Sequence, residues 1–405
     1  MENDWKRLVP IMWRLFSLAG APPQNREFTI FYTDTKTGEE NKPQRHISFA
    51  TEKDFLGFME KRKPLRLDIG PAMAVCPRFE KFCGWGEQVA VASEFKADID
   101  IDSYDFKLPD KDKSRGGPPI RPGRTCCSGR DTCTACWNLV NAGATIIDAG
   151  LRSLGAKRIA WFFSGGRGMH CWVFDGGAGA TFSSPDRRVR ECLAERIAPA
   201  NPVTLLDRID PVATEIICAM FPCLAKVIPR LPATVGLELP EEDMFLGWYV
   251  DAYPASAFYA MSKRMKAGDV CDDIGFAGIK KYGRLAYRRK KPITDAQERK
   301  QVADVIDRIR QRIRIEASGL WPPPPRGSLT RAIVEAGLWS LMPRIDREVT
   351  EQPGHLLKAP LTLHPLTKKL AIFVKQADLA TFVPSGDGSD APARLADFDE
   401  WLSRK

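Results

Sequence analysis

The apolar positions at the start of the chain follow the period of a helix and then change to that of a strand. The first twenty residues carry apolar side chains at helical spacing, which predicts an amphipathic helix that ends at Gly20 and the proline pair after it. Beyond it, alternating apolar and polar positions predict a helix at about 54–61 and strands at 27–32, 46–50, 66–70 and 87–95. Short strands interleaved with helices are typical of a mixed α/β or α+β sheet domain.

Later in the chain the pattern predicts a loop, a helical region and a return to strands. Residues 107–125 are rich in Pro, Gly and charge and predict a loop, whereas the pattern from 183 to about 320 is mostly helical. The clearest helix starts at Thr294, and its basic face fits either a solvated surface or a nucleic-acid groove. The prolines after Trp321 end this region, and strand-like stretches return at 343–350 and 361–374.

One alternating stretch, ADIDIDSYD at 97–105, combines apolar and acidic positions. On a strand, Ile99 and Ile101 point to one face while Asp98 and Asp100 stand together on the other. Two carboxylates this close repel each other, and a divalent Mg²⁺ or Mn²⁺ between them relieves the repulsion. An acidic strand end exposed to solvent is the simpler alternative. A calcium loop is excluded, because a serine occupies the turn position that needs glycine.

Composition and charge indicate a globular protein with a bias toward polyanionic partners. The 405 residues are 44% hydrophobic and 27% charged, which suits two or possibly three domains with full cores. The formal net charge of +9 weakly favours nucleic acid as a partner. Arg7 and Arg14 interrupt the first apolar stretch, and no uncharged apolar run approaches the ~18 residues of a membrane span. We therefore expect a protein that is neither secreted nor bound to a membrane.

The cysteines favour metal binding over disulfides. Eleven cysteines, an odd number without a signal peptide, are typical of reduced thiols in a cytosolic or nuclear protein. Four of them follow the spacing CC-x5-C-x2-C, at Cys126, Cys127, Cys133 and Cys136. This spacing predicts a closed structural Zn²⁺ site that anchors a helix from Trp137, with four free thiols as the alternative. Because neighbouring side chains on an extended backbone diverge, one of the adjacent pair could be a bystander.

A glycine-rich stretch, SGGRGMH at 164–170, lies between two apolar strands. Backbone N–H groups in such a turn can approach an anion closely, and Arg167 and His170 add positive charge or hydrogen bonds. Triphosphates are held in this way, although the turn also fits an ordinary hairpin.

Three further candidate residues lie far down the chain. Asp346, in the strand-like PRIDREVT, offers a third carboxylate. Lys358 and His364 each lie on a short apolar stretch that would fix the side chain in place. Taken singly, each also fits an ordinary lysine or histidine without a ligand.

Taken in order, four stretches resemble the catalytic small subunit of the archaeal and eukaryotic type of DNA primase. They read DIDIDSYD, CC-x5-C-x2-CW, SGGRGMHCWV and PRIDREVT-x4-HLLKAPLTLHP. The resemblance covers most of the chain and is strongest at about 64–175 and 342–366. It implies an α+β fold whose catalytic core contains an RNA-recognition-like sheet. That core would comprise 1–182 and 327–405, with a zinc module at about 107–140 inside it and a helical subdomain at 183–326.

The resemblance also implies roles for individual residues. Asp98, Asp100 and Asp346 would hold two catalytic Mg²⁺ or Mn²⁺ ions. The residues expected to contact the nucleotide's triphosphate are Ser164, Arg167, His170, Lys358 and His364. Further nucleotide and pocket contacts are expected from Glu27, Arg45, Arg66 and Asp68.

The activity implied is that of a DNA-dependent RNA polymerase of the primase type, which makes short RNA primers de novo on single-stranded DNA by two-metal nucleotidyl transfer. The expected partners are the template, ribonucleoside triphosphates, a large subunit with an iron–sulfur cluster and a replicative DNA polymerase complex. The location would be nuclear in a eukaryote and otherwise cytoplasmic. Alternatives are a stand-alone primase-polymerase, an end-joining polymerase of the same superfamily, or a non-catalytic zinc-stabilised nucleic-acid-binding subunit.

Three positions depart from the family's usual pattern. The glycine turn usually reads SGRRG, and Gly166 replaces its first arginine. Arg66 stands where a lysine is more familiar, and the loop before Cys126 is longer than expected.

Overall fold

The computed structural model of the chain describes residues 4–18, 23–33, 37–38, 42–79, 82, 89–104, 127, 133–176, 180–208, 210–224, 338, 341–384 and 391–403. The chain divides into two units. The first comprises Met1–Asp100, Leu151–Arg196 and Arg344–Lys405, and the second comprises Ile101–Gly150 and Ile197–Pro343. The predicted loop at 107–125, the helix from Thr294 and the prolines after Trp321 lie outside the described residues. The division into a catalytic core, a zinc module and a helical subdomain stays a prediction.

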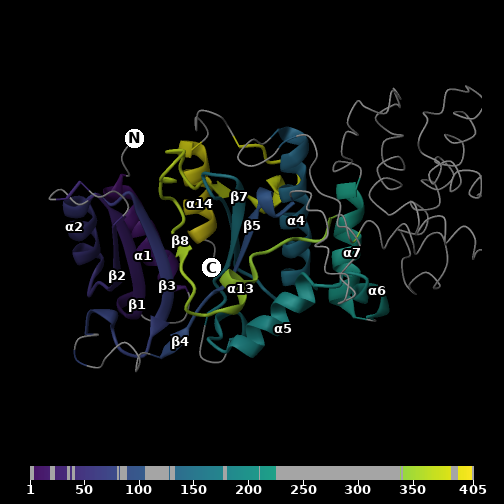
Figure 1. The fold of residues 1–405 in the computed structure, drawn as a ribbon, viewed down its shortest axis with the longest axis horizontal. Helices are drawn as coiled ribbons and strands as arrows, with labels where there is room; N and C mark the ends of the chain where they lie inside the picture. Colours follow the sequence, from purple (N-terminus) through teal and green to yellow (C-terminus); the bar gives the residue numbers. More distant parts are fainter. Residues whose placement is uncertain are drawn as a thin grey trace, which may run out of the picture. The chain divides into compact units, whose positions relative to one another are not determined.

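The first unit contains two antiparallel sheets, and Figure 1 labels most of their strands. Sheet A has the order β2 (Lys42–Ile47), β1 (Arg26–Tyr32), β3 (Arg66–Met73) and β4 (Ala90–Ala92), and β8 (Leu357–Lys358) also pairs with β3. Sheet B has the order β5 (Phe95–Asp100), β7 (Gly168–Val173), β6 (Ile159–Phe163) and β9 (Phe373–Val374). The structure is therefore of the predicted α+β class.

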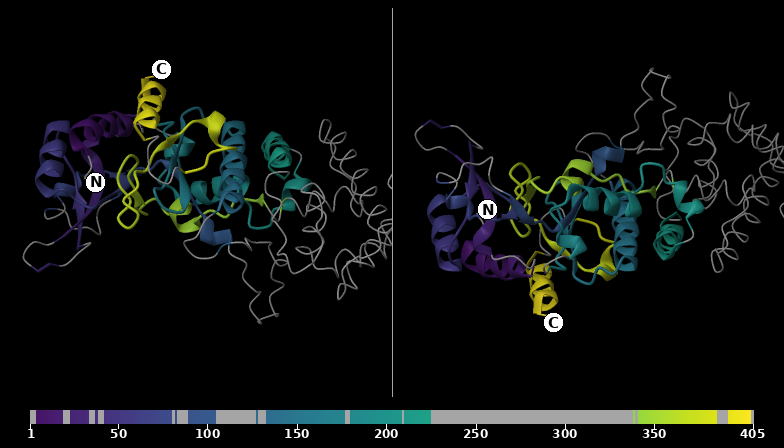
Figure 2. Two further views of the ribbon diagram at one scale, coloured as in Figure 1. Left: turned by 90° about the horizontal axis from the view of Figure 1, so that it is seen from above. Right: turned by 90° about the horizontal axis from the view of Figure 1, so that it is seen from below.

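The helices of the first unit cover these sheets because each carries an apolar stripe. Both views in Figure 2 place α1 (Trp5–Ser17) and α2 (Glu52–Arg62) on one face of sheet A. Phe28 of β1 packs against Phe16 of α1 and Phe55 of α2. The remaining helices of this unit are α5 (Arg187–Ile197), α13 (Arg347–Glu351) and α14 (Ala391–Ser403).

One apolar core serves both sheets. Buried Leu67 and Ile69 of sheet A belong to the same cluster as Phe162 and Trp172 of sheet B. The helix α14 contributes Phe398, whose ring lies 5.2 Å from that of Phe162. Polar side chains that leave this core are therefore presented by a rigid framework.

The second unit is helical where the structure describes it. Its helices are α4 (Thr134–Ser153), α6 (Thr204–Asp207) and α7 (Pro211–Leu224). Gly150 lets α4 pack closely, since a Cβ at this position would lie 3.2 Å from side-chain atoms of Ile197 and Ile216. Among the described residues, no helix is long and apolar enough to cross a membrane.

Four predicted strands differ from the structure. The stretch predicted at 87–95 forms β4 and only the first residue of β5, and the stretch predicted at 361–374 forms one bridge, between Leu363 and Leu370, and β9. The predicted strand at 46–50 instead spans Lys42–Ile47, because the apolar Phe49 belongs to the core contact with α2 and not to the strand. The predicted strand at 343–350 is a single bridge between Ile345 and Ile99, followed by α13. The carboxylate of Asp346 caps this helix, which ends the extended conformation.

Candidate active site

The acidic strand lies as its alternation predicts. Ile99 is fully buried, whereas the Asp98 and Asp100 side chains are 24% and 36% exposed. In the pairing of β5 with β7, Asp98 lies opposite His170. The Nε2 of His170 is 3.6 Å from Oδ1 of Asp98, and Arg167 forms an ion pair with Asp100 at 3.2 Å. The acidic strand β5 is therefore paired with β7, the strand that begins at the glycine-rich turn.

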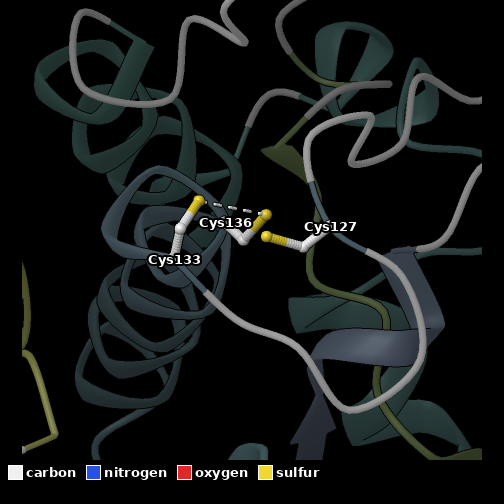
Figure 3. Close-up of side chains that lie close together, drawn as sticks. All are labelled: Cys127, Cys133 and Cys136. Atoms are coloured by element: carbon white, nitrogen blue, oxygen red, sulfur yellow. Dashed lines mark hydrogen bonds between the residues drawn. The ribbon is translucent and has the colours of Figure 1, made fainter.

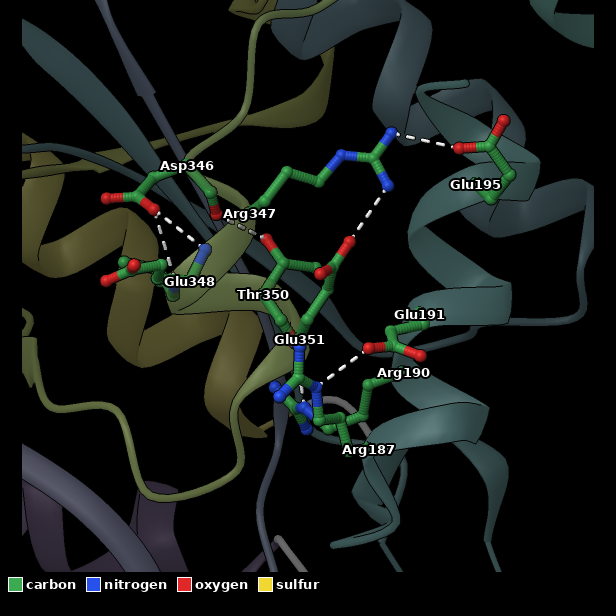
Figure 4. Close-up of polar contacts among 10 residues, drawn as sticks. Arg187, Arg190, Glu191, Glu195, Asp346, Arg347, Glu348, Thr350 and Glu351 are labelled. Carbon is green, nitrogen blue, oxygen red and sulfur yellow. Dashed lines mark hydrogen bonds and ion pairs between the residues drawn. The ribbon is translucent and has the colours of Figure 1, made fainter. Parts of the chain in front are cut away.

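Asp346 joins this group through its backbone. Its N–H donates to the Asp98 carbonyl at 2.9 Å, and the neighbouring residues Ile345 and Ile99 form the bridge. This register sets Asp346 opposite Asp98, where Cβ atoms of an antiparallel pair lie about 5 Å apart. Figure 4 shows the Asp346 carboxylate at the start of α13, where Oδ1 accepts the N–H groups of Glu348 and Val349. The cap thus uses one oxygen of the carboxylate.

The glycine-rich turn is wound around a serine hydroxyl. Ser164 Oγ accepts the N–H groups of Gly166 at 3.2 Å and Gly168 at 3.1 Å, so these two donors are used inside the turn. Gly165 has φ +77°, and a Cβ there would lie 2.6 Å from the Lys369 carbonyl oxygen. Only glycine combines this conformation with so close an approach.

A second segment, residues 358–369, is fastened to this turn. Lys358 donates from Nζ to the Ser164 carbonyl, and Thr367 donates from Oγ1 to the Gly165 carbonyl. The Nδ1 of His364 accepts the N–H groups of Leu366 and Thr367 at 3.3 Å each, which places the proton of a neutral ring on Nε2. That Nε2 lies beside Gly166, since a Cβ on Gly166 would be 2.9 Å from it. Lys358 and His364 therefore converge on the turn, and their contact with a nucleotide's triphosphate stays a prediction.

Burial and neighbouring cations set the charges of this region. Burial, followed by the charges of Lys358, Arg66 and His364, lowers the pKa of His170 to about 3. His170 is therefore a neutral imidazole and supplies hydrogen bonds, not positive charge. Burial also lowers the pKa of Lys358 to about 7, with Arg66 acting in the same direction and Asp68 opposing it. An anion near Lys358 would raise its pKa and restore its positive charge, as is expected of a site that binds anions.

Sheet A contributes the remaining predicted residues. Arg66 and Asp68 form a two-point ion pair at 2.6 and 2.8 Å on β3, and Asp68 lies opposite Lys358 of β8. Burial raises the pKa of Asp68, and the charge of Arg66 opposes the rise. Burial likewise raises the pKa of Glu27, which is 4% exposed on β1. Arg45 is exposed on β2, and its charge opposes the rise for Glu27.

Several buried polar residues escaped the sequence analysis. His46 pairs with Glu27, its Nδ1 lying 2.9 Å from Oε1. Arg26 and Glu94 form a fully buried ion pair, and Lys96 donates to the His355 carbonyl at 2.7 Å. For Glu94 and Lys96, the polar residue at every second position in SEFKADID, where the strand is otherwise apolar, could have indicated a buried polar role, whereas no such pattern marks Arg26 or His46.

Arginines also join α5 to α13, next to Asp346. Buried Arg190 donates from Nε to the Thr350 carbonyl at 2.8 Å. Figure 4 shows Arg347 between Glu195 of α5 and Glu351 of its own helix, at 3.1 and 2.9 Å. These contacts hold the helix that Asp346 caps.

The cysteine cluster lies in the second unit. The sulfur atoms of Cys127, Cys133 and Cys136 all lie within 4.8 Å of one another (Figure 3). The sulfurs of Cys133 and Cys136 are 3.7 Å apart. Two thiolates at ~2.3 Å from a tetrahedral Zn²⁺ would be ~3.8 Å apart, so the thiol spacing fits this ion. Cys126 lies outside the described residues.

Comparisons with known proteins all find similarity to the same kind of protein. A sequence model described as DNA primase small subunit matches residues 98–220, which include the β5 aspartates and the glycine-rich turn. The DNA primase small subunit of Saccharomyces cerevisiae is 28% identical over 389 residues, covering 93% of this chain and 81% of the yeast protein. The protein of the same name from Drosophila melanogaster is 26% identical over 347 residues, covering 84% of this chain and 68% of the fly protein.

Proposed function

Because the chain belongs to the family of DNA primase small subunits, we propose that it synthesises short RNA primers de novo on single-stranded DNA. The reaction would transfer a nucleotidyl group from a ribonucleoside triphosphate to a 3′-hydroxyl. The observation that carries this proposal is the pairing of Asp346 with Asp98, which joins a third carboxylate to the acidic strand beside the glycine-rich turn.

The three carboxylates fit divalent metal ions. Asp98 and Asp100 stand two residues apart on one side of a strand, and Asp346 faces Asp98 from the start of α13. Carboxylates so arranged repel one another, and oxygen ligands of this kind are what Mg²⁺ and Mn²⁺ prefer. When bound, such ions acidify the attacking hydroxyl and neutralise charge on the leaving pyrophosphate.

The chain's own residues would bind and orient the triphosphate. Lys358 and Arg66 supply positive charge at the edge of sheet A, and Arg167 ties the turn to Asp100. Neutral His170 lies beside Asp98, and the Nε2 of His364 lies beside Gly166 of the turn. Fixed donors of this kind stabilise developing charge without reorganising during the reaction.

Two further features belong to the proposal. Cys127, Cys133 and Cys136 would hold a structural Zn²⁺, because their thiols match its ligand type and spacing. De novo synthesis requires two nucleotides to be held at once, and the chain offers one candidate triphosphate site in its described residues. A second subunit is therefore expected, and the family resemblance implies a large subunit with an iron–sulfur cluster and a replicative DNA polymerase complex as the proposed partners.

Dinucleotide synthesis on a single-stranded template tests the proposal. Asp98→Asn and Asp346→Asn each keep the side-chain volume and remove one charge, and both are expected to abolish dinucleotide formation. The matched control is Asp399→Asn, which alters an exposed aspartate of α14 that pairs with Arg14 at 3.2 Å. Wild-type synthesis by the Asp98 variant would eliminate the assignment. Parallel reactions with deoxynucleotides, with and without the large subunit, separate a primase from a stand-alone primase-polymerase.

A further inference from the structure

The backbone of His46 has a strained conformation. Its φ is +56°, a left-handed value that residues other than glycine rarely adopt. It lies inside β2, where the β1–β2 pairing shifts register: Phe28 faces Ile47, and two residues later Ile30 faces Gln44. The strand therefore bulges at 45–46, and a bulge turns a side chain in a direction that regular pairing does not allow. Such strain persists where the surrounding structure imposes it.

The side chain that results from this conformation contacts a buried carboxylate. His46 Nδ1 lies 2.9 Å from Oε1 of Glu27, whose side chain is 6% exposed. On its other side, β3 also shifts register between Ile69 and Ala72. Gly70 lies in that irregularity, and a Cβ there would be 2.8 Å from Oε2 of Glu27. One carboxylate oxygen thus contacts His46 of β2, and the other lies close to β3 at Gly70, where a larger residue would collide with it.

The residues around Glu27 adjoin the nucleotide site proposed above. Gly70 is two residues along β3 from Asp68, which pairs with Lys358. A Cβ at Gly70 would also be 3.0 Å from Leu356, two residues before Lys358. The charges that lower the pKa of Glu27 against the effect of its burial are those of His46, Arg45 and Lys96.

We propose that His46 is a positioning residue, which fixes the orientation of the Glu27 carboxylate in the nucleotide pocket. The inference rests on the proposed function, since it assigns His46 to the same site. The bulge places the imidazole against the buried Glu27 carboxylate, and strained residues of this kind cluster at functional sites. The imidazole is retained in a costly conformation because it directs Glu27.

Substitution can separate the strain from the contact. His46→Gly relieves the positive φ and removes the imidazole, so its melting temperature is expected to stay within about 2 °C of the wild type or to rise. Its KM for ribonucleoside triphosphate is nevertheless expected to rise about tenfold. His46→Asn tolerates the same backbone conformation and keeps a donor for Glu27, and it is expected to recover most of that loss. The matched control, Lys63→Gly, relieves a φ of +42° at the end of α2, away from Glu27, and should leave KM unchanged.

The measurement is steady-state dinucleotide synthesis by the full chain with its large subunit, with KM and kcat determined separately. A lower fraction of folded enzyme lowers kcat alone, so a change in KM reports on positioning. A His46→Gly variant with wild-type KM, or an Asn variant no better than the Gly variant, would overturn the inference. Retained synthesis by Asp98→Asn would instead refute the proposed function, and the inference with it.

Discussion

The ion pair between Arg26 and Glu94 gives the sharpest energetic prediction. Two hydrogen bonds of 2.7 and 2.5 Å join the guanidinium of β1 to the carboxylate just before β5, and both side chains are 1% exposed. Arg26 also donates to the Gly70 carbonyl at 3.0 Å. The pair therefore connects sheet A to the strand that carries Asp98.

Removing one partner leaves a buried charge without its counterion. Replacing either Arg26 or Glu94 by Met is expected to destabilise the first unit by about 3–5 kcal/mol. The Glu94 variant should lie at the upper end, because the cations of Lys96 and Arg190 then face Arg26 without a carboxylate between them. The double variant removes both charges of the pair while Lys96 and Arg190 remain, so it should be more stable than the Glu94 variant, in which these two cations also face Arg26.

Amide hydrogen exchange of peptides from β1 and β5 is the appropriate assay, because a chain of two units does not unfold in one transition. The coupling energy follows from the four proteins of the double-mutant cycle. If the double variant is as unstable as the sum of the two single variants, the pair contributes no coupling, and the account of it as a matched buried ion pair is wrong.

Three further predictions concern the site and the cysteine cluster. Gly168→Ala would force a Cβ against the Ile99 carbonyl, and we expect a loss of about 3 kcal/mol by thermal unfolding, together with loss of synthesis. The pKa of Lys358 is lowered to about 7, so its positive charge is lost as the pH rises through 7, and KM for the nucleotide should rise from pH 6 to 8.5 in the wild type but not in Lys358→Met. Between about pH 7 and pH 10.5, Lys358 is protonated in the unfolded chain but largely deprotonated in the folded chain. Lys358 therefore makes the free energy of unfolding rise with pH over this range. Atomic absorption should find zinc in the wild-type chain, and Cys133→Ser should lose it, whereas the Ser variant of the exposed Cys192 should keep it.

The features that were predictable from the sequence are those in which local pattern and tertiary structure agree. The period of two in ADIDID requires Asp98 and Asp100 to share a face, and burial of Ile99 then selects which face is exposed. Gly165 and Gly168 likewise indicate a tight turn in the sequence, because a side chain at either position would collide with its neighbours. The burial of the β6 and β7 residues follows from continuous apolar runs.

Other features depend on contacts between distant segments that no local pattern records. PRIDREVT alternates like a strand, but the cap formed by Asp346 turns it into a helix after one bridge. The role of His46 depends on a bulge, which is set by the register of the neighbouring strands and not by its own sequence. The pairing of Arg26 with Glu94 spans 68 residues, so neither residue alone suggests a buried partner.

The replacement of the family's first turn arginine by Gly166 has a structural counterpart in His364. A Cβ at this position would lie 2.9 Å from His364 Nε2, so a larger side chain would displace the imidazole from the turn. Two backbone N–H groups fix His364 Nδ1 as an acceptor, and its Nε2 therefore presents one directed N–H in place of a mobile guanidinium. A single N–H offers fewer contacts to a triphosphate than the five donors of a guanidinium do, and in the proposed function the triphosphate's charge falls more heavily on Lys358 and Arg66. The lowered pKa of Lys358 belongs to the same arrangement, because burial of the ammonium and the nearby charge of Arg66 outweigh the opposing charges of Asp68 and Asp98.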